Sequence, residues 1–200
     1  MGIYLLSGPI ACGKGAASEK IEEDKGKDNV SVFTLSDILR EEVNQRGLPE
    51  TRDTLATVGE ELRDELGEGA LAEKIKPHIE ENINKGINTV VDSIRKNEEV
   101  EVIKNYFSDS CLMYIQTSME TRLDRLKSRA RRDDMAMEDI QEVLQRELDE
   151  YDFHKIQERA DILVNGELSK EKMKEMIKEK LQEFRGNNQE VKNYISPKIK

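Results

Sequence analysis

The chain of 200 residues contains no tryptophan, and aromatic residues make up only 4% of it. Its core must therefore be built from aliphatic side chains, because hydrophobic residues amount to 36% of the sequence against 37% charged ones. No apolar run approaches the length of a membrane span, and the N-terminus has neither the charged region nor the cleavage site of a secretory signal. We expect a cytoplasmic protein with one domain of ordinary size and a heavily charged surface.

Cysteine and histidine are also scarce. The two cysteines, Cys12 and Cys111, are too few for a disulfide framework, and no other Cys or His lies near either of them at metal-ligand spacing. His78 and His154 are far apart in sequence, and we interpret both as ordinary surface or boundary residues. The net charge of -10 argues against a general nucleic-acid binder. We therefore expect neither nucleic acid nor a membrane as a partner.

One stretch is chemically informative. Residues 8–15 read Gly-Pro-Ile-Ala-Cys-Gly-Lys-Gly, follow the apolar run Ile-Tyr-Leu-Leu and precede a helix-prone segment. A buried strand that enters a helix through such a loop brings backbone N–H groups and the positive end of the helix to one anion-sized hollow. Gly8 and Gly13 let the backbone curl, and Lys14 can reach the outer phosphates of a nucleotide. The pattern predicts a phosphate-binding loop; the alternative is a glycine turn with a surface lysine.

Two residues of this stretch bear on metal binding. Gly15 and Ala16 lack the hydroxyl that ligates magnesium in most loops of this kind. Mg²⁺ must then be held by nucleotide phosphates, water and carboxylates elsewhere. Asp92 is our candidate, acting through a metal-bound water, because it ends the apolar strand predicted over residues 87–91. The alternative is that Asp92 only caps a turn or a helix.

Arginines follow several of the predicted elements. Arg40 lies in the first turns of a helix that Ser36 or Asp37 caps, just after a strand over residues 30–35. Arg63 lies beside the buried stripe of a helix over residues 51–66. Arg95 follows Asp92 by three residues and starts the next helix. Arg40 and Arg95 fall just beyond strand ends, and the helix of Arg63 opens toward the same edge of the sheet, where a bound phosphate group could be reached.

The most basic segment covers residues 119–132. We interpret Arg122 and Arg125 as surface residues that pair with acidic neighbours at i,i+3 spacing. Arg129 and Arg131 have the chemistry to neutralise a transferring phosphoryl group from a mobile flap, although a surface role is the alternative. We expect both to act catalytically, together with Lys14 and Asp92.

Five short apolar strands alternate with helices along the chain. The strands cover residues 3–6, 30–35, 87–91, 111–117 and 162–164. This order predicts an α/β fold in three layers, with a five-stranded parallel sheet and helices on both faces. Ligands of such sheets lie outside the carboxyl ends of the strands. We expect one domain over residues 1–185 and a polar tail over 186–200, with Gly186 ending the last helix.

These motifs resemble the P-loop nucleoside and nucleotide kinase superfamily. The chain is most similar to a mainly archaeal group of predicted nucleotide kinases related to adenylate and dephospho-coenzyme A kinases. The resemblance spans residues 2 to about 170 and is carried by residues 8–15, 35–42, 46–48, 61–63, 91–100 and 129–134. Ser93 departs from it, because the group often has glycine at that position.

The resemblance implies a role for each candidate residue and two small molecules, ATP and Mg²⁺. The donor nucleotide would contact Gly8, Ala11, Cys12, Gly13, Lys14, Gly15 and Ala16 in the loop, and Asn165 and Gly166 in a later turn. The acceptor would be bound by Ser36, Arg40, Arg63 and Arg95. A small lid over about 129–137 would contain Arg129 and Arg131.

Three functions remain open. The first is ATP-dependent transfer of the γ-phosphoryl group to a small acceptor, which we expect to be a nucleoside monophosphate and not dephospho-coenzyme A. The second is an ATPase switch that signals to a partner, and the third is nucleotide binding without turnover. The identity of the acceptor, the choice between ATP and GTP and the oligomeric state do not follow from the sequence.

Overall fold

The computed structural model describes residues 1–128 and 137–195, and at positions 52, 137–141, 143 and 187–195 it describes the backbone alone. The strands are β1 (Ile3–Ser7), β2 (Val30–Thr34), β3 (Asn88–Ile94), β4 (Cys111–Gln116) and β5 (Ile162–Asn165). The helices are α1 (Lys14–Lys25), α2 (Leu35–Gln45), α3 (Arg52–Leu66), α4 (Ala70–Lys85), α5 (Asn97–Tyr106), α6 (Met119–Ser128), α7 (Met137–Glu150), α8 (Phe153–Glu158) and α9 (Lys170–Ile195), with a short 3-10 turn, η1 (Lys27–Asn29).

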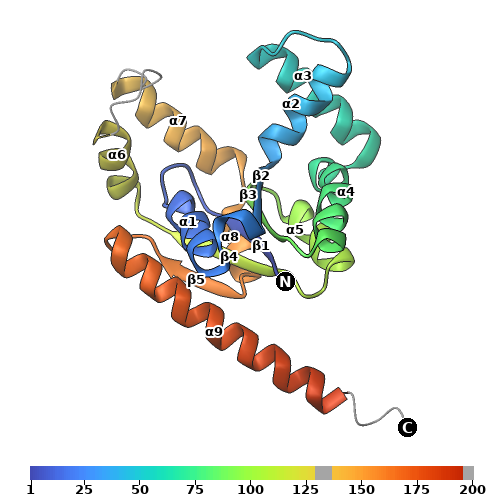
Figure 1. Ribbon diagram of the computed structural model, residues 1–200. Helices are drawn as coiled ribbons and strands as arrows, with labels where there is room; N and C mark the ends of the chain where they lie inside the picture. Colours follow the sequence, from blue (N-terminus) through green and yellow to red (C-terminus); the bar gives the residue numbers. More distant parts are fainter. Residues whose placement is uncertain (129–136, 196–200) are drawn as a thin grey trace.

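The five strands form one parallel sheet in the order β2-β3-β1-β4-β5. The first strand, β1, lies at the centre, where Leu5 is in register with Val91 of β3 and Leu112 of β4. Parallel neighbours require crossover connections, and helices provide them on both faces (Figure 1). The predicted α/β fold is confirmed.

Neighbouring residues of β1 pack into two separate hydrophobic cores, because side chains alternate between the two faces of a strand. Leu5 packs in one cluster with Ile75 of α4 and Ile103 of α5. Leu6 packs in the other with Ile21 of α1 and Ile177 of α9. Burying each of these side chains stabilises the fold by about 1.5–3 kcal/mol. The sheet is thereby held between two helical layers.

Helices α2 and α3 lie beside the sheet, where Val43, Val58 and Leu62 form a separate cluster with Ala70 of α4. The prediction that Ser36 or Asp37 caps α2 was wrong. Thr34 is the cap, and its side chain accepts a hydrogen bond from the N–H of Asp37, whose carboxylate reaches back to Thr34. The last residue of β2 therefore also begins the helix, so no loop separates the two elements.

The carboxyl ends of the strands meet where β1 passes into α1. Helices α2 and α3 rise on one side of this point, and α6 and α7 rise on the other (Figure 1). At the far end of the chain, α9 runs through Gly186 to Ile195, so the prediction that Gly186 ends this helix was wrong. Within the described parts of the chain, no helix has the length and apolarity needed to cross a membrane.

Candidate functional site

The loop between β1 and α1 turns through positive φ at Gly8 (131°), Ala11 (61°) and Gly13 (120°). Gly8 has to be glycine, because a Cβ there would lie 2.6 Å from the carbonyl oxygen of Ile115. Among the described residues, no side chain caps the first turn of α1, and that turn contains no acidic residue. No described side chain therefore competes with an anion for the positive end of this helix.

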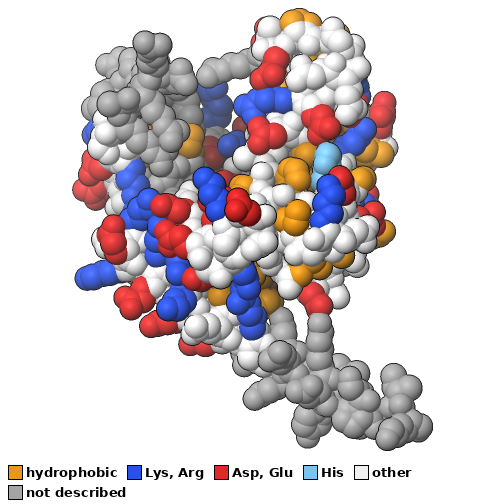
Figure 2. Space-filling model, viewed as in Figure 1, with side chains coloured by type: hydrophobic (Ala, Val, Ile, Leu, Met, Phe, Trp, Pro, Cys, Tyr) orange, Lys and Arg blue, Asp and Glu red, His pale blue; other side chains and the backbone are white. Residues whose placement is uncertain are grey.

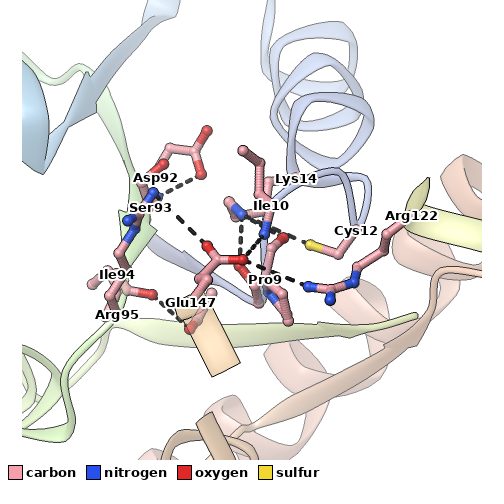
Figure 3. Close-up of polar contacts among 12 residues, drawn as sticks. Pro9, Ile10, Cys12, Lys14, Asp92, Ser93, Ile94, Arg95, Arg122 and Glu147 are labelled. Atoms are coloured by element: carbon pink, nitrogen blue, oxygen red, sulfur yellow. Dashed lines mark hydrogen bonds and ion pairs between the residues drawn. The ribbon is translucent and has the colours of Figure 1, made fainter. Parts of the chain in front are cut away.

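Lys14, at the start of α1, folds back over the loop. Its Nζ donates to the carbonyl oxygens of Gly8 at 2.6 Å and Pro9 at 3.1 Å, and it lies 3.8 Å from Sγ of Cys12 (Figure 3). The ammonium group is thus already at the loop that the sequence predicted it to serve. Burial raises the pKa of the Cys12 thiol, although nearby Lys14 partly opposes that rise. Cys12 is therefore a packing residue of the loop in its thiol form.

Asp92 lies in β3, which neighbours β1, and so comes beside the loop. Its Oδ1 accepts a hydrogen bond from the N–H of Ser93 at 2.5 Å. Burial raises the pKa of Asp92, and the Lys14 ammonium opposes the rise. Ser93 has a φ of 66°, a left-handed conformation that glycine adopts at less cost.

The helix after Asp92 is capped by a different residue. Glu99 accepts hydrogen bonds from the N–H groups of Arg95 and Lys96, at 2.9 and 3.0 Å, at the start of α5. The helix-cap interpretation of Asp92 is therefore wrong. Asp92 also does not end the strand as predicted, because β3 continues through Ile94. The Asp92 carboxylate lies close enough to Lys14 for the two charges to interact.

The residues at the loop fit magnesium only in part. No group of three or more His, Cys, Asp or Glu residues in the described regions could hold a metal ion by itself. Mg²⁺ usually keeps several waters and binds through one or two carboxylates together with nucleotide phosphates. Asp92 could supply such a carboxylate, and a bound Mg²⁺ would neutralise charge on the phosphates.

A buried carboxylate on α7 also contacts the loop. Oε2 of Glu147 accepts a hydrogen bond from the N–H of Ile10 at 2.7 Å and lies 3.5 Å from Nη1 of Arg122, while Oε1 lies 3.9 Å from Nη2 of Arg95 (Figure 3). The side chains of Glu147 and Arg122 are only 7% and 1% exposed. The prediction that Arg122 is a surface residue was wrong.

The sequence interpretation missed Glu147. Its signal was its spacing, because Glu147 follows the buried Leu144 by three residues and so shares its face of α7. The neighbouring Arg146 is exposed. A carboxylate on an inward helical face needs a cation from elsewhere, and Arg122 on α6 provides it.

Arg125 joins the loop to the turn after β5, so its interpretation as a surface residue was also wrong. Its guanidinium donates to the carbonyl oxygens of Cys12, at 2.8 Å, and Gly166. Thr117 donates to the same Cys12 carbonyl at 2.9 Å. The predicted donor-contacting turn of Asn165 and Gly166 therefore lies against the loop.

A cavity of about 490 Å³ opens beside these contacts. It is lined by Gly13, Gly15, Ala16, Glu19, Arg125, Leu168, Ser169, Lys170 and Met173. One wall is the start of α1, and another is the segment that follows Gly166. A nucleoside whose phosphates enter the loop would have room here.

Three of the residues predicted to bind the acceptor lie on α2 and α3, and the structure gives two of them other neighbours. Arg40 pairs with Asp37 at 2.8 Å and with Glu50 at 3.0 Å, and its side chain is 43% exposed. Arg63 packs its guanidinium over Gly59, where a Cβ would lie 3.5 Å from Nη1. Ser36 is exposed at the start of α2. Figure 2 shows the surface hollowed beside these two helices, with Lys or Arg side chains at the wall of the hollow.

The predicted lid, with Arg129 and Arg131, lies outside the described residues.

The chain matches the sequence model of the AAA domain family over residues 7–144. A UPF0200 protein of Methanoculleus marisnigri is 35% identical over 86% of this chain and 90% of its own length. A UPF0200 protein of Methanocaldococcus jannaschii is 32% identical over 90% of this chain and 91% of its own. A UPF0200/UPF0201 protein of Archaeoglobus fulgidus is 34% identical over 98% of this chain, which spans only 60% of that relative.

Solved structures with a similar fold are kinases. A gluconokinase from Sinorhizobium meliloti has a TM-score of 0.58 at 14% identity, with 93% of this chain and 94% of that one covered. A shikimate kinase from Acinetobacter baumannii, in complex with shikimate, has a TM-score of 0.54 at 16% identity, with 93% of each chain covered. At these identities the likeness shows the fold.

Proposed function

The chain belongs to the AAA domain family and groups with the UPF0200 proteins, and we propose that it is an ATP-dependent phosphotransferase acting on a small molecule. The observation that carries the proposal is the arrangement at the end of β1. Lys14 lies on an uncapped helix start, within a glycine-bent loop, and Asp92 of the neighbouring strand faces it. A phosphate cradle with a carboxylate at its side is what transfer of a phosphoryl group needs.

The fold supports a small acceptor. The solved structures of similar fold include kinases named for gluconate and shikimate. The surface is also hollowed beside α2 and α3, where such a molecule would approach the donor (Figure 2).

For the acceptor we propose a nucleoside monophosphate. Arg40 and Arg63 come from two helices that pack together, and guanidinium groups bind phosphate oxygens through paired hydrogen bonds. An oxygen of the acceptor phosphate would attack the γ-phosphorus of ATP while the bond to the β–γ bridging oxygen breaks. ADP would leave with that electron pair, and no proton need move because both phosphates are ionised.

A panel assay tests the proposal. The full chain, with ATP and Mg²⁺, is incubated with each nucleoside monophosphate, with dephospho-coenzyme A, or with no acceptor, and the phosphorylated product is measured. Product with a nucleoside monophosphate supports both parts of the proposal. Transfer to dephospho-coenzyme A alone would overturn the choice of acceptor. Slow ATP hydrolysis at a rate that no acceptor changes would instead favour a nucleotide switch.

A further inference from the structure

Arg95 is held from two sides by residues one helical turn apart. Its Nη2 lies 3.9 Å from Oε1 of Glu147, and its guanidinium carbon lies 5.3 Å from the ring centroid of Tyr151. The N–H of Tyr151 donates to the carbonyl of Glu147 at 3.1 Å, so the two side chains project from one continuous turn at the end of α7. A carboxylate and an aromatic face both attract a guanidinium group.

The Glu147 carboxylate is itself fixed. Oε2 takes the N–H of Ile10 in the phosphate loop at 2.7 Å and lies 3.5 Å from Nη1 of Arg122. Nε and Nη1 of Arg122 are buried and have no hydrogen-bond partner among the described residues, so the charge of Glu147 is its compensation. Ile10, Arg122 and Arg95 thus approach one carboxylate from three elements (Figure 3).

We propose that Glu147 and Tyr151 are positioning residues that set Arg95 relative to the phosphate loop. The loop would hold the donor phosphates, and Arg95 would contact the acceptor phosphate, so a shared carboxylate fixes the separation of the two reacting groups. Transfer depends steeply on that separation. The role of Arg95 rests on the proposed function, whereas its placement by Glu147 and Tyr151 does not.

Two substitutions separate the contacts. Glu147→Gln keeps an oxygen for the N–H of Ile10 but removes the charge that attracts Arg95. Tyr151→Leu removes the ring and leaves the Arg122 pair intact. With AMP and CMP as probe acceptors, we expect each variant to raise the acceptor KM and lower kcat by about tenfold, and to leave the KM for ATP within about threefold. Glu142→Gln, an exposed carboxylate on the same helix, is the matched control.

A double-mutant cycle excludes a merely structural role. In an Arg95→Ala background, Tyr151→Leu should cause no further loss of kcat/KM, because it acts through the missing guanidinium. Glu147→Gln should lose less there than in the parent, and what loss remains reflects its contacts with Arg122 and Ile10. Full additivity in this background would overturn the proposal. Thermal melts of each variant identify any loss of folding. If Glu147→Gln fails to fold because Arg122 loses its partner, Tyr151→Leu alone decides the question.

A second measurement does not depend on turnover. The Nη–Hη signal of Arg95, assigned by its absence in Arg95→Ala, should be shifted in the parent chain by the Tyr151 ring and by the nearby Glu147 carboxylate. We expect Tyr151→Leu and Glu147→Gln each to remove part of this shift. A signal unchanged in both variants would overturn the proposal. If the parent chain phosphorylates no acceptor, the proposed function fails, and this signal still decides whether the two residues position Arg95.

Discussion

Nζ of Lys14 lies 2.6 Å from the carbonyl oxygen of Gly8, so the charge that should clamp the donor phosphates rests on the loop itself. Lys14→Ala removes this charge and should cut phosphoryl transfer by about a thousandfold while the fold stays intact. Initial rates with ATP and the acceptor found in the panel assay, together with a thermal melt, measure both effects. Lys178→Ala, an exposed lysine of α9, is the control. Equal turnover in Lys14→Ala and the parent would refute the role of Lys14.

Asp92 should act through magnesium, because Gly15 and Ala16 give the loop no ligating hydroxyl. Asp92→Asn should therefore need more Mg²⁺ to reach its maximal rate. The measurement is the transfer rate over a magnesium titration, for variant and parent side by side. A normal rate with unchanged magnesium dependence would leave Asp92 with a structural role in β3 only.

Gly166 lies where the turn after β5 meets the phosphate loop. A Cβ there would overlap Oγ1 of Thr117 and lie 2.8 Å from the carbonyl oxygen of Cys12. Gly166→Ala should therefore destabilise the fold by about 1–3 kcal/mol and raise the KM for ATP. Gly186→Ala tests the opposite case: a Cβ there meets no described atom within 4 Å, and alanine should stabilise α9 by about 0.5–1 kcal/mol. Urea unfolding curves give the change in free energy of unfolding for each substitution. Equal changes for the two substitutions would contradict the prediction that only Gly166 needs to be glycine.

The buried cap of α5 makes stability depend on pH. Burial raises the pKa of Glu99 from its ordinary 4.5 to about 7. The folded state therefore favours the neutral form, and the stability contributed by this group is full below pH 4.5 and lost as pH rises through 7. The loss amounts to on the order of 3 kcal/mol. The side chain of the Glu99→Gln variant cannot ionise. Between pH 4.5 and 7, the free energy of unfolding of this variant should therefore rise relative to that of the parent. A difference between the two proteins that stays constant with pH would contradict the prediction.

The sequence predicted the sheet and the loop because their signals are local. Apolar runs of strand length predict the strands, and Gly8, Gly13 and Lys14 predict the loop. The parallel order then places Asp92 beside the loop without further information.

The contacts around Glu147 and Arg122 could not be predicted in the same way. Both residues belong to charged helices, and a charge on an inward face looks like a charge on the surface until the partner helix is known. The partner lies 25 positions away, on the other side of residues 129–136. Thr34 was missed for a different reason: the strand ends and the helix begins at the same residue, which no loop signal marks.

The last prediction concerns the acceptor side, where Arg40 is held by Asp37 and Glu50. If Arg40 and Arg63 bind a monophosphate, Arg40→Ala and Arg63→Ala should each raise the acceptor KM by about tenfold or more and leave the KM for ATP nearly unchanged, because the lost contact lies on the acceptor side only. Glu50→Gln should act in the reverse direction. It releases Arg40 from a competing carboxylate, so the acceptor KM should fall by a few fold, the size of an exposed ion pair. Steady-state kinetics with each substrate varied in turn distinguish these effects. Equal increases in the KM of donor and acceptor, or a Glu50→Gln variant that binds the acceptor more weakly, would show that the two arginines do not form the acceptor site.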